Sequence, residues 1–128
     1  MAEIRIPVFT TGQQLAAIRD EVDAAIERVL ASGWFILGRE VAAFEEEFAA
    51  YCGVDYAVGV ANGTDAIELA LRAVGTGPGD EVITVAHTAP FTGLAILATG
   101  ATPVFVDVDE DTMLLDATLI EAALSPKT

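Results

Sequence analysis

The residues with the clearest chemical potential form a short turn between a predicted strand and a predicted helix, Asn62-Gly63-Thr64-Asp65. Asn62 is a residue type that caps helix N-termini, and Asp65, three positions later, can reach back to it. Gly63 carries no side chain, so a ligand could approach the backbone closely. The amides of Gly63, Thr64 and Asp65 would point out of the positive end of the helix, and the Thr64 hydroxyl would add a donor. The turn therefore predicts a phosphate site, although an ordinary capped turn without a ligand stays an alternative.

Other residue types that could do chemistry are few. His87 is the only histidine, Lys127 the only lysine and Cys52 the only cysteine of the chain. We expect Cys52 to be a small buried residue at a helix end. An acidic turn follows a predicted strand, but it lacks the glycine and the closing glutamate of a calcium loop, so we expect a solvated turn and no metal site. Its acidic residues are Asp107, Asp109, Glu110 and Asp111.

The spacing of apolar side chains indicates two helices in the first part of the chain. Apolar residues three and four positions apart predict one amphipathic helix that ends at Gly33 and another that ends at Gly53. An apolar connector, residues 34–38, joins them. The apolar positions are Leu15, Ile18, Val22, Ile26 and Val29 in the first helix and Val41, Phe44, Phe48 and Tyr51 in the second, whose outer side carries Glu45, Glu46 and Glu47.

The rest of the chain alternates strands with helices. The strands are expected at 56–60, 81–85 and 103–108, and the helices at 66–73, 92–98 and 116–124. Val and Ile runs separated by helices are typical of an α/β fold with a mostly parallel sheet flanked by helices. Three strands are fewer than the usual five to six or so per sheet. We therefore expect one incomplete domain, made of a helical segment at 1–54 and the start of an α/β domain at 55–128.

Composition and charge limit the classes of function. Hydrophobic residues make up 53% and charged residues 20% of the chain, which is typical of a globular protein. The net charge of −14 produces a surface that repels nucleic acid and anionic lipid, so we expect neither as a partner. Apolar runs are too short to span a bilayer and the first residues lack the pattern of a signal peptide, so a cytoplasmic location is expected.

Several segments, in this order along the chain, carry a resemblance to a known family. They lie at 25–30, 32–38, 41–45, 63–73, 77–83, 87–89 and 100–109. Together they resemble the DegT/DnrJ/EryC1/StrS family of sugar aminotransferases, which depend on pyridoxal 5'-phosphate. No single motif is decisive, but the ordered set is specific and covers nearly the whole chain. The resemblance implies the N-terminal part of the large domain of a fold-type-I pyridoxal-phosphate transferase.

The resemblance implies cofactor contacts for two segments. Gly63 and Thr64 match the turn that holds the cofactor phosphate, and the His87-Thr88-Ala89 segment matches the loop over the cofactor ring. Many relatives have an aromatic residue at the position of Ala89, which stacks on the ring. In this chain, stacking would be weaker or would pass to His87 or Phe91, and a hydrogen-bonded loop histidine is an equally open role for His87.

The resemblance implies a different role for Trp34 and Phe35. They match a segment near the partner subunit and the sugar pocket. Packing at a subunit interface is the plainer expectation, because aromatic residues are enriched at interfaces in general. Contact with the substrate stays open.

The resemblance finally implies the reaction of the full-length protein. That protein would be a homodimer that transfers an amino group from an amino-acid donor to a keto nucleotide-sugar. The Schiff-base lysine and the carboxylate that pairs with the pyridinium nitrogen come from the middle third of family chains. Lys127 does not match the family's lysine motif, so we expect this chain to be an N-terminal fragment with no catalytic residue and no activity alone. The alternatives are another fold-type-I enzyme, such as a sugar dehydratase, or a non-catalytic remnant that acts as a binding partner.

Overall fold

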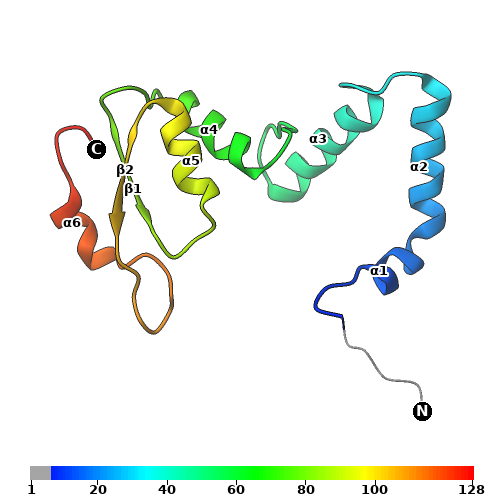
Figure 1. Ribbon diagram of the computed structural model, residues 1–128. Coiled ribbons are helices and arrows are strands. Elements are labelled where there is room, and N and C mark those ends of the chain that lie inside the picture. Colours follow the sequence, from blue (N-terminus) through cyan, green and yellow to red (C-terminus); the bar gives the residue numbers. More distant parts are fainter. Residues whose placement is uncertain (1–6) are drawn as a thin grey trace, which may run out of the picture. The chain divides into compact units, whose positions relative to one another are not determined.

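The computed structural model describes residues 7–128 and contains helices and a small sheet (Figure 1). The chain divides into two compact units, Met1–Gly59 and Val60–Thr128. The predicted boundary between a helical segment at 1–54 and the start of an α/β domain at 55–128 stays a prediction. Within the described residues, no helix is long and apolar enough to cross a bilayer.

The first unit consists of helices α1 (Gly12–Ala17), α2 (Arg19–Ser32) and α3 (Arg39–Cys52). The chain leaves α2 at Gly33 and α3 at Gly53, where φ is 66° and 69°. A left-handed backbone at the end of a helix favours glycine, so both predicted helix ends are confirmed.

The first predicted helix is divided in two. Ile18, with φ of −121°, lies between α1 and α2 and interrupts the helical hydrogen bonds. The acidic residues Asp20 and Glu21 then occupy the first turn of α2. Negative charge is favoured at that end of a helix, which explains a new start there.

The apolar sides of these helices are largely exposed within this unit. Phe44, Phe48 and Tyr51 form a stacked row along α3, with ring centroids 5.5 Å and 6.2 Å apart. Ala49 is the only buried residue among those described in this unit. Cys52, predicted to be buried, is exposed at the end of α3, because nothing within the described residues covers this helix end.

The second unit is built around a parallel β-α-β arrangement. Strand β1 (Glu81–Val85), helix α5 (Phe91–Thr99) and strand β2 (Thr102–Val106) follow one another, and the strands pair in parallel from Glu81↔Thr102 to Val85↔Val106. Helix α4 (Gly63–Ala73) contacts α5. The predicted α/β fold with a parallel sheet is thereby confirmed.

The core of the second unit lies between α5 and the strands. Ala95, Ile96 and Thr99 of α5 are buried, together with Thr84 of β1 and Ala101 of the turn before β2. The Thr99 hydroxyl donates to the Ile96 carbonyl and accepts from the Ala101 amide, so this buried polar group is satisfied. In Figure 1, α5 and α6 (Ile120–Ala123) lie on opposite sides of the two strands. The sheet is therefore flanked by helices, as predicted.

Two of the predicted elements differ in the structure. Residues 56–60 do not form a strand, because β1 and β2 pair only with each other and no ladder partner for this segment lies within residues 7–128. The last predicted helix is shorter than expected and consists of a 3₁₀ turn, η1 (Ala117–Leu119), followed by α6. Asp116 begins this turn and accepts hydrogen bonds from the amide and hydroxyl of Thr118.

Candidate functional site

The turn at Asn62 closes the start of α4 with side-chain hydrogen bonds. The Asn62 side-chain oxygen accepts from the Asp65 amide at 3.0 Å, and the Asn62 side-chain nitrogen donates to the Asp65 carboxylate at 3.2 Å. Asn62 has an extended backbone, and α4 begins at the next residue. The predicted N-cap, with Asp65 reaching back, is confirmed.

The capping pair decides which amides remain available to a ligand. The amide of Asp65 is already bonded to Asn62, so the expectation that it points freely out of the helix is wrong. The amides of Gly63 and Thr64 have no acceptor within residues 7–128. A Cβ added at Gly63 would meet no atom within 4 Å, so no internal packing explains the glycine. The start of α4 therefore offers two donors and an open face to an anion.

The topology places this end of α4 near the carboxyl ends of the strands. Arg72, near the end of α4, donates a hydrogen bond of 2.6 Å to the carbonyl of Ala98, near the end of α5. Helix α5 returns from the end of β1 to the beginning of β2, so its last turn lies at the amino ends of both strands. Since α4 ends there too, its first turn points toward the opposite edge. Ligands of open α/β sheets bind at that carboxyl edge.

The loop that follows β1 supplies the second predicted group of site residues. His87 and Ala89 are both exposed and lie between the end of β1 and the start of α5. The His87 imidazole has no hydrogen-bond partner in the described part of the chain. Phe91, the first residue of α5, is also exposed. The structure thus places His87 and Ala89 just after the carboxyl end of β1.

An apolar hollow lies beside this loop. It has a volume of about 420 Å³ and is lined by residues of the loop, α5 and β2, including Thr88, Ala89, Leu94 and Phe105. Ala89 contributes only a methyl group to its wall. The small side chain at this position leaves room beside the loop.

Lys127 lies at the amino ends of the strands, whereas the loop follows the carboxyl end of β1. Its backbone carbonyl accepts a hydrogen bond of 2.8 Å from the amide of Glu81, the first residue of β1. Strand β1 extends for about 13 Å from there to Val85, at about 3.3 Å per residue. Lys127 is therefore at the amino end of β1, whereas His87 and Ala89 follow its carboxyl end.

The connector between α2 and α3 holds Trp34 and Phe35 in defined positions. The Trp34 indole nitrogen donates to the carbonyl of Ile36 at 2.6 Å, and Leu37 has a left-handed backbone with φ of 51°. A Cβ at Gly38 would lie 2.9 Å from the Trp34 carbonyl oxygen, so this position requires glycine. The connector is therefore a constrained turn rather than a loose link.

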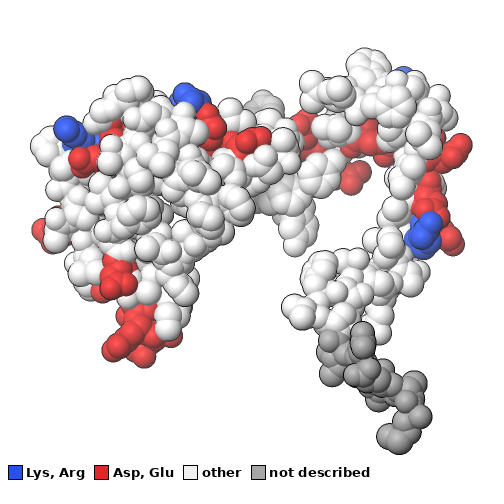
Figure 2. Space-filling model, viewed as in Figure 1, with Lys and Arg blue, Asp and Glu red and all other residues white. Residues whose placement is uncertain are grey.

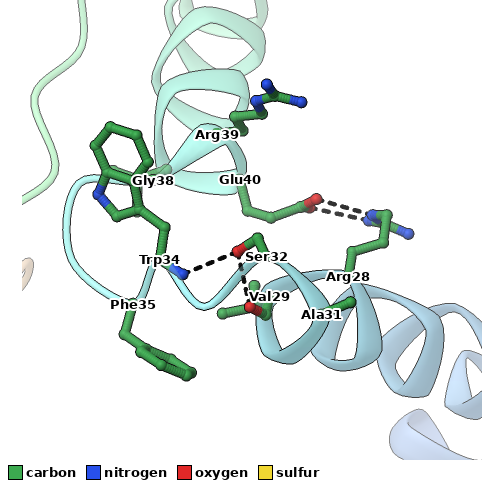
Figure 3. Close-up of a pocket in the computed structure, with 10 residues that line it drawn as sticks. Arg28, Val29, Ala31, Ser32, Trp34, Phe35, Gly38, Arg39 and Glu40 are labelled. Atoms are coloured by element: carbon green, nitrogen blue, oxygen red, sulfur yellow. Dashed lines mark hydrogen bonds and ion pairs between the residues drawn. The ribbon is translucent and has the colours of Figure 1, made fainter.

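The aromatic rings of the connector are exposed beside a hollow in the first unit. Trp34 and Phe35 are 64% and 65% exposed, and Figure 3 shows their rings pointing away from each other. The hollow has a volume of about 640 Å³ and is lined by both rings and by residues of α2 and α3. Arg28 and Glu40 close one side of it, with two hydrogen bonds of 2.8 Å and 2.9 Å. These bonds lower the pKa of the Glu40 carboxyl.

The acidic turn after β2 is satisfied by its own residues. Asp109 accepts hydrogen bonds of 2.8 Å from the amide and the hydroxyl of Thr112, and these bonds lower the pKa of Asp109. Figure 2 shows acidic side chains gathered on this loop. Within the described residues, no group of acidic, histidine or cysteine side chains is arranged to hold a metal ion.

Glu45 accepts a hydrogen bond that the sequence did not predict. It was expected on the outer side of α3, but it is half-buried and accepts a hydrogen bond of 2.7 Å from the amide of Gly59. A signal was present in the spacing, since Val41, Glu45 and Ala49 are four residues apart and share one face of α3. Val41 and Ala49 are also withdrawn from solvent.

Comparison with known proteins adds an independent line of evidence. The chain is 52% identical over 124 residues to a dTDP-3-amino-3,4,6-trideoxy-alpha-D-glucose transaminase of Streptomyces venezuelae, and the match covers 97% of this chain and 33% of that protein. It is 47% identical to a UDP-2-acetamido-2-deoxy-3-oxo-D-glucuronate aminotransferase of Pseudomonas aeruginosa, over 90% of this chain and 32% of that one. The chain thus spans about a third of the length of these relatives.

A solved structure and a family profile agree with these relatives. The crystal structure of NtdA from Bacillus subtilis, with bound cofactor PMP, matches with a TM-score of 0.91 and 32% identity, over 99% of this chain and 30% of that one. The profile of the DegT/DnrJ/EryC1/StrS aminotransferase family matches residues 16–128. The chain belongs to the DegT/DnrJ/EryC1/StrS aminotransferase family.

Proposed function

We propose that the protein containing this chain transfers an amino group from an amino-acid donor to a keto group on a nucleotide-linked sugar. One of the two relatives described above is named for a 3-amino sugar carried on dTDP and the other for a 3-oxo sugar carried on UDP, which supports this substrate class. The observation that carries the proposal is the pair of available amides at Gly63 and Thr64, at the carboxyl edge of the sheet.

The residues at this edge fit pyridoxal 5'-phosphate, on which aminotransferases of this family depend. The phosphate of the cofactor carries negative charge, and the start of α4 supplies two amides, the Thr64 hydroxyl and the positive end of the helix dipole. The open face at Gly63 allows the phosphate to approach the backbone. Gly63 and Thr64 would therefore hold the phosphate, and Asp65 would act through its hydrogen bonds to Asn62.

The loop after β1 would lie beside the cofactor ring. When bound, pyridoxal phosphate supplies the electron sink that amino-group transfer requires. The exposed His87 imidazole would orient the ring. The apolar walls of the hollow beside Ala89 would exclude water from one side of the ring. In this proposal, Ala89 contributes contact area but no aromatic stacking.

The lysine of the reaction would come from outside these residues. Lys127 is exposed and lies at the amino end of β1, away from the loop that would flank the ring. An exposed lysine is also strongly hydrated, which makes it a poor nucleophile. We therefore propose that residues 1–128 alone are inactive.

Trp34 and Phe35 would lie where a second subunit meets the sugar pocket. Their exposed rings and the constrained connector support a role at such a surface, because aromatic residues carry much of the energy of interfaces. The proposed assembly is a homodimer.

The test uses the complete protein and two kinds of substitution in the turn. Thr64→Val removes the hydroxyl and Gly63→Val fills the open face, whereas Thr64→Ser retains the hydroxyl as a control. We expect each Val variant to weaken binding of pyridoxal phosphate by about tenfold or more, because charge-assisted hydrogen bonds or their geometry are lost. Affinity would be measured by titration of cofactor absorbance, and amino transfer by product formation from glutamate and a keto nucleotide-sugar. Unchanged cofactor affinity in both Val variants would show that the phosphate binds elsewhere.

A further inference from the structure

The segment that leads into the phosphate-binding turn bonds to helix α3 through one side chain. Residues 56–61 form no strand, and their backbone makes a single hydrogen bond within residues 7–128. That bond joins the Gly59 amide to the Glu45 carboxylate at 2.7 Å. Asn62, which caps α4, follows three residues later. The carboxylate of Glu45 is thus the one polar anchor of the approach to the turn in the described part of the chain.

The environment of Glu45 shows that this contact is specific. Glu45 is half-buried on the face of α3 that also carries Val41. A Cβ added at Gly59 would lie 3.4 Å from the Glu45 carboxylate oxygen and 3.8 Å from a Val41 methyl group, so the backbone of Gly59 lies close against this face. A hydrogen bond from an amide to an ionised carboxylate is stronger than one between neutral groups. The neighbouring Glu46 and Glu47 are exposed and make no hydrogen bond within residues 7–128.

We propose that Glu45 is a positioning residue for the phosphate-binding turn, acting through the backbone of Gly59. This inference rests on the proposed function, because it requires that Gly63 and Thr64 bind the cofactor phosphate. With the Gly59 amide fixed, fewer conformations are open to the residues between it and Asn62. The turn is then already ordered when the phosphate arrives, so less conformational entropy is lost on binding and the affinity is higher.

The experiment compares neighbouring glutamates in the complete protein. Glu45→Ala removes the acceptor, Glu45→Gln keeps an oxygen that can accept from Gly59, and Glu46→Ala is the matched control on the same helix. We expect Glu45→Ala to raise the Kd of pyridoxal phosphate by about tenfold, with kcat largely retained at saturating cofactor. Glu45→Gln should restore most of the affinity, and Glu46→Ala should leave it unchanged. Hydrogen exchange of the peptide containing Gly59 should speed up in Glu45→Ala only.

Each other outcome overturns the inference in a distinguishable way. Equal cofactor Kd in Glu45→Ala and Glu46→Ala would show that the bond does not position the turn. If Glu45→Ala fails to fold, Glu45→Gln decides the question, and a Kd far above that of the unchanged protein would contradict the inference. Thr64→Val is measured in parallel. If it weakens binding and Glu45→Ala does not, only the role of Glu45 fails, whereas unchanged binding in both means that the phosphate site itself is wrong.

Discussion

Arg72 donates a hydrogen bond of 2.6 Å from its guanidinium to the backbone carbonyl of Ala98, and its Nε bonds to Glu68. One side chain near the end of α4 therefore bonds to the last turn of α5, and the ends of the two helices lie side by side. We expect Arg72→Met to lower the free energy of unfolding of the complete protein by about 1 kcal/mol, because the bond to the last turn of α5 is lost. Denaturant unfolding would measure it.

The control for this prediction is another arginine with a similar local ion pair. Arg19 bonds to Asp23 at 2.7 Å, four residues along α2, but it makes no hydrogen bond to a second helix among the described residues. Arg19→Met should change the free energy of unfolding by no more than about 0.5 kcal/mol. Equal losses in the two variants would show that the bond to Ala98 contributes nothing.

A charge change at Asn62 should separate the capping role from phosphate binding. Aspartate caps helices as well as asparagine does, but in Asn62→Asp a carboxylate replaces the amide that donates to Asp65, so we expect a modest loss of thermal stability. It would place a negative charge beside the amides of Gly63 and Thr64, and we expect the affinity for pyridoxal phosphate to fall by about tenfold as a result. Asn62→Ser, which keeps a capping oxygen without charge, serves as the control. A similar Kd for the aspartate and serine variants would contradict an anion site at this helix end.

The Arg28–Glu40 pair predicts a pH-dependent contribution to stability. The hydrogen bonds from Arg28 hold the pKa of Glu40 below its ordinary value of 4.5. A carboxyl whose pKa is lower in the folded state stabilises the fold above the unfolded pKa, and this contribution is lost as the pH falls through the folded pKa. Thermal melts of the unchanged protein and of Glu40→Gln should therefore differ most near neutral pH and converge in acid. Glu46→Gln is the control, and a difference in melting temperature that does not change with pH would refute the assignment.

An aromatic side chain at position 89 should strengthen cofactor binding. Ala89 lines a hollow of about 420 Å³ beside the loop that would flank the cofactor ring. Phenylalanine there could stack on the ring, and aromatic pairs contribute about 0.5–1.5 kcal/mol, which corresponds to about two- to tenfold in affinity. We expect Ala89→Phe to lower the Kd of pyridoxal phosphate accordingly, measured by absorbance titration. Ala122→Phe, at an exposed alanine of α6 that does not line the hollow, is the control, and an equal effect of both would argue against stacking at position 89.

The elements that sequence alone predicts best are those defined by local chemistry. The strand at 81–85 and the ends of α2 and α3 at Gly33 and Gly53 are found where they were expected. The cap at Asn62 also follows from local residue types, since its partner Asp65 is three positions away. Each of these features depends on interactions within a few residues, so the sequence contains the necessary information.

The features that the sequence did not predict depend on contacts between distant residues. Residues 56–60 have the composition of a strand, but a strand requires a partner, and none lies within residues 7–128. Glu45 looked like its solvent-exposed neighbours Glu46 and Glu47, and only its bond to Gly59, 14 residues away, distinguishes it. The roles of Gly63, Thr64, His87 and Ala89 toward the cofactor, of Trp34 and Phe35 toward a second subunit, and the cytoplasmic location stay predictions.

The loop between β2 and η1 closes on its own residues. Val108 and Leu115 form an antiparallel bridge, and the Asp109 amide donates to the carbonyl of Leu114 at 2.9 Å. The tip of the loop includes the exposed Asp111. It extends from a base that is closed by bonds between other residues. Such tips tolerate insertions. For laboratory work, a short peptide tag or a fluorescent label attached at Asp111 would leave the bonds that close the base of this loop in place.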